Sequence, residues 1–269
     1  MSKAPIGMLD SGLGGLSVWR EVATLLPKES IHYIADSLRC PYGNKEESEV
    51  KTITKELVEI LLGKGCKLIV LACNTATAVA IQELRATYDI PFVGMEPALK
   101  PAAKLTKTGH IGILATENTF KGAHFHRTKE NWAADKEVHI QPGYGLVEAV
   151  EKGSLEGKEV EALLRPLIQP MMEAKVDQLV LGCTHYPFLS NAIHEITRGK
   201  INLIDPAPAV AMQVKRILTE HQWMNVEESP SWHFYSSANV MHLKQFLDAN
   251  LPESRLHGRT FEKLFVQIR

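Results

Sequence analysis

The sequence predicts an α/β protein made of two similar lobes with mostly parallel sheets. Short apolar, β-branched runs alternate with longer amphipathic segments, which is typical of parallel sheets covered by helices. Three short motifs recur in the same order about 105 to 111 residues further along the chain. The length of 269 residues fits one large domain or two modest ones, at roughly 150 residues per domain.

The strand candidates are short runs rich in Val, Ile and Leu. Several are continuously apolar, which indicates strands buried on both faces of a parallel sheet. In chain order they are Ile6–Leu9, Ile31–Ala35, Leu68–Ala72, Phe92–Val93, Ile111–Ala115, Val138–Gln141, Leu179–Gly182 and Asn202–Ile204, with a late candidate at Trp232–Tyr235.

The amphipathic segments between these runs predict helices in right-handed crossovers between strands. Pro166 and Pro170 should kink or shorten the helix that contains them, because proline lacks the N–H and clashes with the preceding turn. The predicted helices cover Leu16–Leu26, Glu46–Leu62, Ala76–Thr87, Val160–Ala174 and Val210–Glu220.

The recurring motifs predict two lobes related by a pseudo-twofold axis. The alternative is chance similarity, since junctions between strands and helices favour small polar residues in many proteins. The matching segments are Ile6–Ser11 with Ile111–Thr116, Val70–Thr75 with Val180–His185, and Glu96–Ala98 with Ala207–Ala209.

Charge and apolar patterning exclude several classes of function. Thirty Lys and Arg residues against 31 Asp and Glu residues give a net charge of −1, which leaves no electrostatic signature for binding nucleic acid or an anionic membrane. The amino-terminal apolar segment is too short for a signal peptide, and the apolar run from Leu68 to Cys73 is far shorter than a membrane span. Four scattered cysteines do not form a disulfide framework. We therefore expect a cytoplasmic protein.

Two of the cysteines occupy the same local context. Cys73 and Cys183 each end an apolar strand and precede the start of a helix, with Asn74 and Thr75 as N-cap residue types and Pro187 suited to a first helical position. Ligands of open α/β sheets bind at the carboxyl ends of the strands. A helix N-terminus also lowers the pKa of a thiol. Cys40 and Cys66 lack this context and are expected to be small hydrophobic residues.

Four chemistries could use these thiols. A redox pair lacks a CxxC spacing, and a zinc site of Cys73, Cys183, His185 and Asp10 lacks the short ligand spacings of structural zinc. A Cys–His hydrolase leaves one thiol unexplained. If the lobes face each other, the two thiols lie on opposite sides of one substrate, so that one removes a proton from carbon and the other returns one to the opposite face. This is racemisation by two bases.

Neighbouring residues fit the last option. Asp10 ends the first strand, and His185 lies two residues after Cys183, so each could polarise a thiol or the ammonium group of an amino acid. Helix capping is the structural alternative for Asp10, and a buried structural histidine is the alternative for His185. The loop Ser11–Gly15 resembles a dinucleotide fingerprint, but Ser17 replaces its third glycine. The amides of this loop could equally bind a carboxylate.

Four motifs in order resemble those of the aspartate/glutamate racemase superfamily, and of its glutamate racemases in particular. The likeness spans roughly residues 5 to 220. The motifs are Asp10-Ser11-Gly12-Leu13-Gly14-Gly15, Pro41-Tyr42-Gly43, Cys73-Asn74-Thr75 and Gly182-Cys183-Thr184-His185-Tyr186-Pro187.

The resemblance implies a cofactor-independent enzyme, with no metal, that interconverts L- and D-glutamate for peptidoglycan synthesis. It also implies an active site in the cleft between the lobes and a carboxy-terminal segment that returns to the first lobe. The first lobe would then comprise residues 1–97 and 208–269, and the second residues 98–207. A homodimer is compatible with the sequence, which does not itself determine the oligomeric state.

The resemblance further assigns roles to individual residues. Cys73 and Cys183 would be the two acid/base residues, assisted by Asp10 and His185. The substrate would be held by Asp10, Ser11, Tyr42, Gly43, Asn74, Thr75, Thr184 and His185, with Thr116 and Thr119 contributing polar contacts from the second lobe.

One segment departs from the family pattern. Family members often carry a Cys-Pro-containing segment before a Val-Glu pair, whereas this chain reads Gln141-Pro142-Gly143 there. Glu151 aligns with the family glutamate, but Glu148 has an equivalent Val-Glu context. We assign a catalytic role to neither. The alternatives to a glutamate racemase are a racemase of aspartate or another small acid, and a non-catalytic two-lobe module that binds zinc or another ligand.

Overall fold

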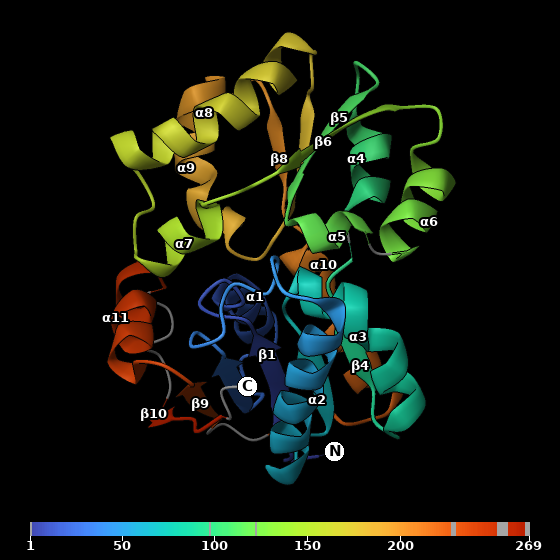
Figure 1. The fold of residues 1–269 in the computed structure, drawn as a ribbon. Coiled ribbons are helices and arrows are strands. Elements are labelled where there is room, and N and C mark those ends of the chain that lie inside the picture. Colours follow the sequence, from blue (N-terminus) through green and yellow to red (C-terminus); the bar gives the residue numbers. More distant parts are fainter. Residues whose placement is uncertain (1, 97, 122, 227–229, 252–257, 267–269) are drawn as a thin grey trace.

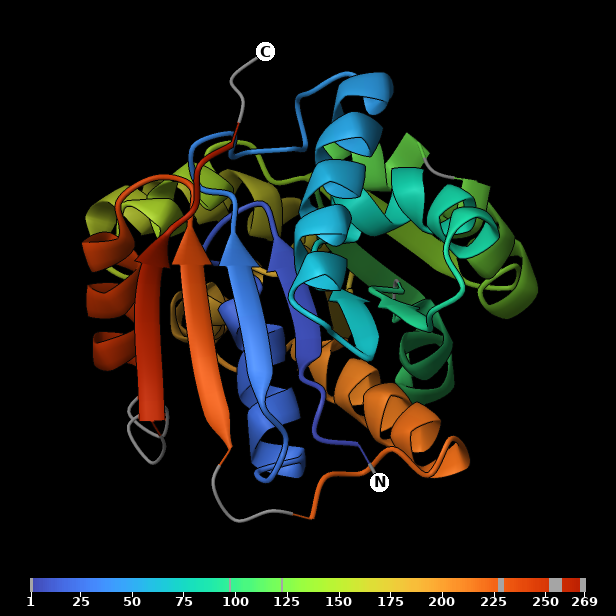
Figure 2. The same ribbon diagram turned by 90° about the horizontal axis from the view of Figure 1, so that it is seen from below.

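Two parallel β-sheets, one in each lobe, form the framework of the protein (Figure 1). The computed structural model describes residues 2–96, 98–121, 123–226, 230–251 and 258–266. The first sheet has the order β10-β9-β2-β1-β3-β4 and the second the order β6-β5-β7-β8, and every strand pair in both is parallel. Figure 2 shows the strands of the first sheet side by side and pointing the same way.

The strand bounds agree closely with the sequence-based expectation. The strands are β1 (Ile6–Asp10), β2 (Ile31–Ala35), β3 (Leu68–Leu71), β4 (Phe92–Gly94), β5 (His110–Ala115), β6 (Glu137–Pro142), β7 (Gln178–Gly182), β8 (Asn202–Ile204), β9 (Ser231–Ser236) and β10 (Gly258–Lys263). Only β10 was not predicted. The α/β class with mostly parallel sheets is therefore confirmed.

Helices cover the faces of both sheets. They are α1 (Leu16–Leu25), α2 (Glu47–Gly63), α3 (Asn74–Thr87), α4 (Leu99–Leu105), α5 (Glu117–Lys121), α6 (Ala123–Trp132), α7 (Leu146–Glu151), α8 (Lys158–Glu173), η1 (Tyr186–Leu189), α9 (Ser190–Thr197), α10 (Ala207–Glu220) and α11 (Val240–Asn250). Pro187 lies in the first turn of the short 3₁₀ helix η1, near its predicted place.

Of the two predicted effects of proline on α8, shortening is wrong, and a kink stays a prediction. This helix contains both Pro166 and Pro170 and still covers sixteen residues. Its apolar stripe includes Leu164 and Ile168, which are fully buried. Burying such a side chain contributes about 1.5–3 kcal/mol, so these two together with the buried Val160 and Met171 offset the cost of about 3 kcal/mol or more for each of the two prolines.

The two sheets share a strand order, which accounts for the recurring motifs. The order β2-β1-β3-β4 of the first lobe matches β6-β5-β7-β8 of the second. β1 thus corresponds to β5 and β3 to β7. The first lobe adds β9 and β10, which come from the end of the chain and extend its sheet beyond β2. The domain limits at residues 97/98 and 207/208 stay a prediction.

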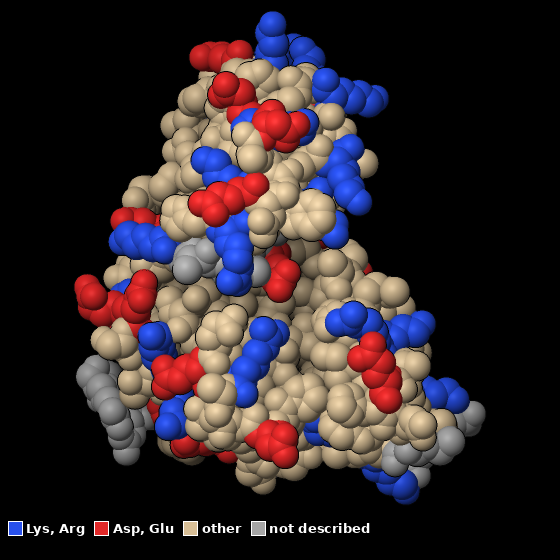
Figure 3. All heavy atoms as spheres, turned by 90° about the vertical axis from the view of Figure 1, so that its right-hand side faces the viewer, with Lys and Arg blue, Asp and Glu red and all other residues tan. Residues whose placement is uncertain are grey.

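Surface charge agrees with the composition. On the face in Figure 3, Lys and Arg side chains are interspersed with Asp and Glu over both lobes, and a hollow separates the lobes. In the described ranges, no helix combines the length and apolarity that a bilayer crossing requires.

Candidate active site

Cys73 and Cys183 lie at matching places in the two lobes. Cys73 follows β3 and is the N-cap of α3, whereas Cys183 follows β7 and precedes η1. Both residues are buried, at 5% and 6% exposure, and both are free thiols. The negative charge that Cys183 would carry as a thiolate contributes to raising the pKa of Cys73. The fold therefore brings the two predicted thiols together where the lobes meet.

The Cys73 thiol is strongly perturbed by burial. Burial is the main cause that raises its pKa to about 12, and the charge of Asp10 adds to the effect. The Ala76 N–H in the first turn of α3 and the Ser11 hydroxyl oppose the increase, and the Cys73 Sγ lies 3.8 Å from the Ser11 Oγ. The expected lowering by the helix N-terminus is present, but burial outweighs it.

Cys183 is linked to a histidine and a carboxylate. Its Sγ lies 3.7 Å from the Nδ1 of His185, and the His185 Nε2 lies 2.7 Å from the Glu151 Oε1. Burial alone would lower the pKa of His185, but hydrogen bonds with Cys183, Cys40 and Glu151 raise it well above its usual value. These contacts favour the protonated imidazole, whose Nδ1 lies beside the thiol and whose Nε2 lies beside the carboxylate and the Gly14 N–H.

The sequence named Glu151 and Glu148 as alternatives for the family glutamate and assigned a catalytic role to neither. The structure separates them, because Glu151 hydrogen-bonds His185 whereas Glu148 lines a separate small pocket together with residues that include Gly43 and Thr116. The last residue of α7 is Glu151, so the helix carries its carboxylate to the cleft. The alignment with the family glutamate was the signal that could have found it.

The glycine loop after β1 binds carboxylates of the protein itself. The N–H groups of Gly12 and Gly15 donate to the Asp10 Oδ2 at 2.9 and 3.0 Å, and the Leu13 N–H donates to the Glu151 Oε1 at 2.6 Å. Burial is the main cause that raises the pKa of Asp10. The amides of this loop thus bind carboxylates of the protein itself, and binding of a ligand carboxylate by the loop stays a prediction.

Two of these glycines also make room for the second lobe. A Cβ on Gly12 would lie 2.1 Å from the Glu151 Oε1, and a Cβ on Gly14 would lie 2.2 Å from the His185 Nδ1. Both distances are far inside van der Waals contact. The glycines are therefore required where Glu151 and His185 approach the backbone of the first lobe.

Four predicted threonines lie where the lobes meet. The Thr75 Oγ1 lies 2.9 Å from the Thr116 Oγ1, which lies 2.9 Å from the Thr119 Oγ1 within the second lobe. The Thr184 hydroxyl donates to the Asp10 Oδ1 at 3.2 Å. The contacts of Thr75 with Thr116 and of Thr184 with Asp10 therefore join the two lobes through polar side chains.

The remaining predicted residues differ in whether their polar atoms are free to form a hydrogen bond with a ligand. Asn74 is 3% exposed and neither its Oδ1 nor its Nδ2 has a hydrogen-bond partner, so its amide is available to a bound molecule. The Tyr42 hydroxyl, by contrast, donates to the Asp36 Oδ2 at 2.5 Å. Gly43 packs against Thr116, since an added Cβ would lie 2.8 Å from the threonine Cβ.

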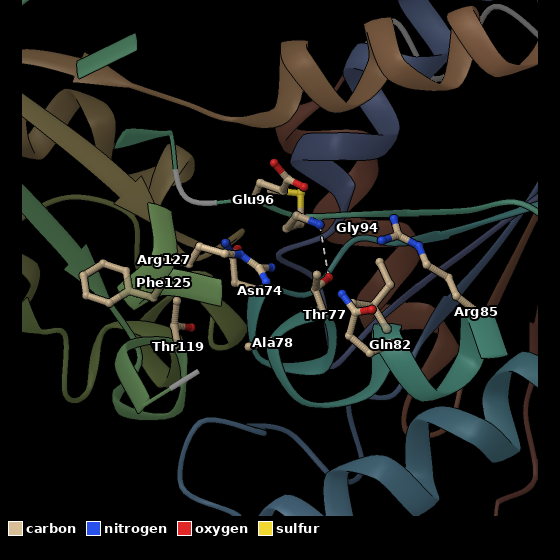
Figure 4. Close-up of a pocket in the computed structure, with 12 residues that line it drawn as sticks. Asn74, Thr77, Ala78, Gln82, Arg85, Gly94, Glu96, Thr119, Phe125 and Arg127 are labelled. Atoms are coloured by element: carbon tan, nitrogen blue, oxygen red, sulfur yellow. Dashed lines mark hydrogen bonds between the residues drawn. The ribbon is translucent and has the colours of Figure 1, made fainter. Parts of the chain in front are cut away.

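A cavity of about 150 Å³ adjoins this site (Figure 4). It lies between α3 and β4 of the first lobe and α5 and α6 of the second, and Asn74, Thr119, Arg85 and Arg127 are among its lining residues. Neither thiol lines it. The cavity is therefore beside the pair of thiols rather than between them.

Cys66 and Cys40 both pack against apolar side chains, as expected. Cys66 is buried in the apolar core of the first lobe, and Cys40 packs at the edge of a core cluster. Cys40 also lies beside His185, which the sequence did not predict, and its thiol helps to raise the pKa of that imidazole. Cys40 precedes the Pro-Tyr-Gly motif, which brings it from a loop of the first lobe to the cleft.

The predicted zinc set does not assemble in the part of the chain that the structure describes. Two clusters there have donor atoms within 4.8 Å of one another, Cys40–Glu151–His185 and His110–Glu137–His139. Neither contains Cys73, Cys183 or Asp10. This arrangement argues against the structural zinc site that the sequence left open.

Comparison with known proteins now decides the family. The profile of the Asp/Glu/Hydantoin racemase family matches residues 6–214. The chain belongs to this family. The resemblance and the enzyme class predicted from the motifs, an amino-acid racemase, are thereby confirmed.

Individual members of the racemase family match almost the whole chain. A glutamate racemase of Ectopseudomonas mendocina (strain ymp) is 43% identical over 94% of this chain and 96% of its own. The crystal structure of glutamate racemase isoform RacE1 from Bacillus anthracis superposes with a TM-score of 0.87 at 30% identity, covering 100% of this chain and 99% of that one. Escherichia coli glutamate racemase, solved with L-glutamate and the activator UDP-MurNAc-ala, gives a TM-score of 0.84 at 30% identity, covering 98% of this chain and 100% of that one.

Proposed function

We propose that this racemase interconverts L- and D-glutamate by proton transfer between two cysteines, Cys73 and Cys183. The observation that carries the proposal is the placement of two buried free thiols after corresponding strands of two similar sheets. A relative named glutamate racemase matches 94% of the chain, and a similar structure holds L-glutamate. Both favour glutamate over aspartate.

The reaction requires one thiolate and one thiol in each direction. The thiolate removes the proton from the α-carbon and becomes a thiol, which leaves a carbanion stabilised by the adjacent carboxylate. The other thiol then donates its proton to the opposite face of that carbon and becomes a thiolate. One C–H bond breaks and one forms, so the balance of protons needs no cofactor.

The raised pKa of Cys73 has a role in this scheme. With a pKa of about 12, the thiol is neutral in the empty protein, and its thiolate is a strong base once it forms. The ammonium group of a bound amino acid places a positive charge beside Asp10 and the thiol, which favours the thiolate. Ionisation of Cys73 is thus coupled to substrate binding.

The second thiol has a different partner. The His185 Nδ1 lies 3.7 Å from the Cys183 Sγ, within reach to exchange a proton with it, and the contacts of the imidazole raise its pKa and so favour its protonated form. Glu151 holds the imidazole from its other nitrogen. Both residues act on the thiol, whereas the unpartnered Asn74 amide and the hydroxyls of Ser11 and Thr75 are suited to bind substrate carboxylates.

We further propose that D-glutamate made in this way supplies peptidoglycan synthesis in the cytoplasm. Four free cysteines fit a reducing compartment. The oligomeric state, for which a homodimer is one prediction, is measurable by sedimentation of the purified chain.

Isotope exchange tests the proposed mechanism. Either enantiomer of glutamate, incubated with the enzyme in deuterated water, is expected to yield a product of opposite configuration with deuterium on the α-carbon. The reason is that the proton delivered to the second face comes from a thiol that exchanges with solvent. Mass spectrometry after chiral separation measures the label, and an inverted product that keeps the original proton excludes two-base transfer.

A substrate panel tests the specificity. Polarimetry with L-glutamate, L-aspartate and other small amino acids should show rapid loss of rotation with glutamate alone. Turnover of aspartate but not glutamate would assign the same two thiols to an aspartate racemase. Stoichiometric zinc without any racemisation would favour the non-catalytic module.

Replacing Glu151 tests its action through His185. Glu151→Gln removes a hydrogen-bonded negative charge that raises the pKa of the imidazole, so His185 should lose its proton at lower pH. The basic limb of the pH–rate profile should therefore move to lower pH, by about one pH unit for each unit of pKa lost. Glu148→Gln is the matched control and should leave the profile in place. An unmoved basic limb in Glu151→Gln would contradict the assignment.

A further inference from the structure

A cluster of metal-binding side chains lies in the second lobe, apart from the thiols. His110 is the first residue of β5, and Glu137 is the first residue of β6. The parallel register pairs His110 with Glu137, while His139 lies two residues further along β6. Because side chains alternate along a strand, Glu137 and His139 project from the same face as the paired His110.

The donor atoms of this cluster have the spacing of a metal site. The His110 Nδ1 lies 3.1 Å from the His139 Nε2, and all three residues have a donor atom within 4.8 Å of the others. Two nitrogens bound to tetrahedral zinc at about 2.0–2.1 Å lie about 3.3 Å apart. The two imidazole nitrogens therefore already have nearly the separation that a shared ion requires.

The burial of the cluster also suits an exchangeable ion. Both histidines are half-buried and Glu137 is exposed. The imidazole rings stack at 5.4 Å between centroids and 25° between planes, which holds them on one side of the strands. The neighbouring strands β5 and β6 hold the two imidazoles in place, while the exposed Glu137 carboxylate can turn to bind an ion that enters from solvent.

We propose that His110, Glu137 and His139 form a binding site for a divalent transition-metal ion of the zinc class. Two imidazoles and one carboxylate are the ligands that such ions prefer over the hard cations Mg²⁺ and Ca²⁺. In the present hydrogen bond one imidazole donates to the other, so the donor moves its proton to its second ring nitrogen when the ion binds. Water completes the coordination shell.

The site lies at the end of the second sheet that faces away from the cleft. The carboxyl ends of β5 and β6 lead into Thr116 and Gly143, whereas the proposed ligands lie at their amino-terminal ends (Figure 1). An ion there would join the edge strand β6 to β5. It should stabilise the second lobe without blocking the reaction, in contrast to an ion on the cluster that contains His185.

Zinc titration of the complete, tag-free chain tests the proposal. Calorimetry should show one Zn²⁺ bound per chain by the wild type, and at least about tenfold weaker binding by His139→Gln and by Glu137→Gln. The control is His194→Gln, which removes an exposed histidine of the same lobe outside the cluster. It should bind zinc like the wild type. Racemisation by all the variants should match the wild type, which shows that they are folded.

Cobalt separates this site from the thiols. Co²⁺ bound by imidazole and carboxylate has no sulfur-to-metal charge-transfer band, whereas binding at Cys40 would produce one. The first equivalent of Co²⁺ should therefore bind without that band and should raise the melting temperature of the wild type but not of His139→Gln. A sulfur band with the first equivalent, or equal zinc affinity in His139→Gln and wild type, would overturn the proposal.

Discussion

Cys73→Ala and Cys183→Ala are each expected to lower glutamate racemisation in both directions by about 10²- to 10⁴-fold or more, the usual contribution of a general acid or base. Each direction of the reaction uses one thiol to remove the proton and the other to return it. Loss of either thiol therefore stops inversion whichever enantiomer is supplied. Coupled assays or circular dichroism of glutamate measure both directions.

The two variants should differ in isotope exchange. In Cys73→Ala the remaining Cys183 faces only one side of the α-carbon, so it can exchange the proton of one enantiomer without inverting it. Cys183→Ala should exchange the other enantiomer. Cys66→Ala provides the control, because it makes the same change to a buried thiol in the core of the first lobe and should keep full turnover.

The result that contradicts the assignment is equally specific. Full racemisation in either cleft variant would show that its thiol transfers no proton. Exchange of the same enantiomer by both variants would place the thiols on one side of the substrate, which contradicts the proposed two-base mechanism.

Much of the fold was predictable because its strands are buried on both faces. Runs such as Leu68–Leu71 and Gln178–Gly182 are entirely buried, and burial of this kind leaves a continuous apolar signal in the sequence. β10 lacks that signal, since it is an edge strand with the sequence Gly-Arg-Thr-Phe-Glu-Lys. Its place depends on pairing with β9, which no local pattern specifies.

In the candidate site, too, some residues were predictable from local sequence and others were not. The positions of Cys73 and Cys183 followed from the rule that strand ends form the ligand site, which depends only on local sequence. The partners of His185 depend on tertiary packing instead. Glu151 comes from α7, and Cys40 comes from a loop of the other lobe. The contact between Glu151 and His185 forms only when α7 packs beside the loop after β7 within the second lobe, and the contact with Cys40 forms only when the two lobes pack together.

Gly14→Ala is expected to produce a large loss of both activity and stability. The added Cβ would lie 2.2 Å from the Nδ1 and 2.6 Å from the Cγ of His185, whose ring is 1% exposed. A buried ring cannot rotate away cheaply, and overpacking of this kind costs about 1–3 kcal/mol. Displacing the imidazole by about 1 Å should also lower turnover on the order of 10²-fold.

Urea denaturation and steady-state kinetics of the same preparation measure the two losses. Gly63→Ala is the matched control, because an added Cβ there meets no atom within 4 Å. Gly63 ends α2, so alanine should be neutral or slightly stabilising. Wild-type stability in Gly14→Ala would mean that the His185 ring does not pack closely against the backbone at Gly14.

Gly12→Ala distinguishes the contact of the glycine loop with Glu151 from its contact with His185. Its Cβ would meet the Oε1 of Glu151 at 2.1 Å, and this is the end of a flexible side chain that can rotate toward solvent. The free energy of unfolding should therefore fall less than in Gly14→Ala. Because the carboxylate then leaves His185, Gly12→Ala should also reproduce the shifted pH profile of Glu151→Gln. A loss of stability in Gly12→Ala as large as that in Gly14→Ala would show that the backbone of the loop, rather than the contact with His185, sets the cost.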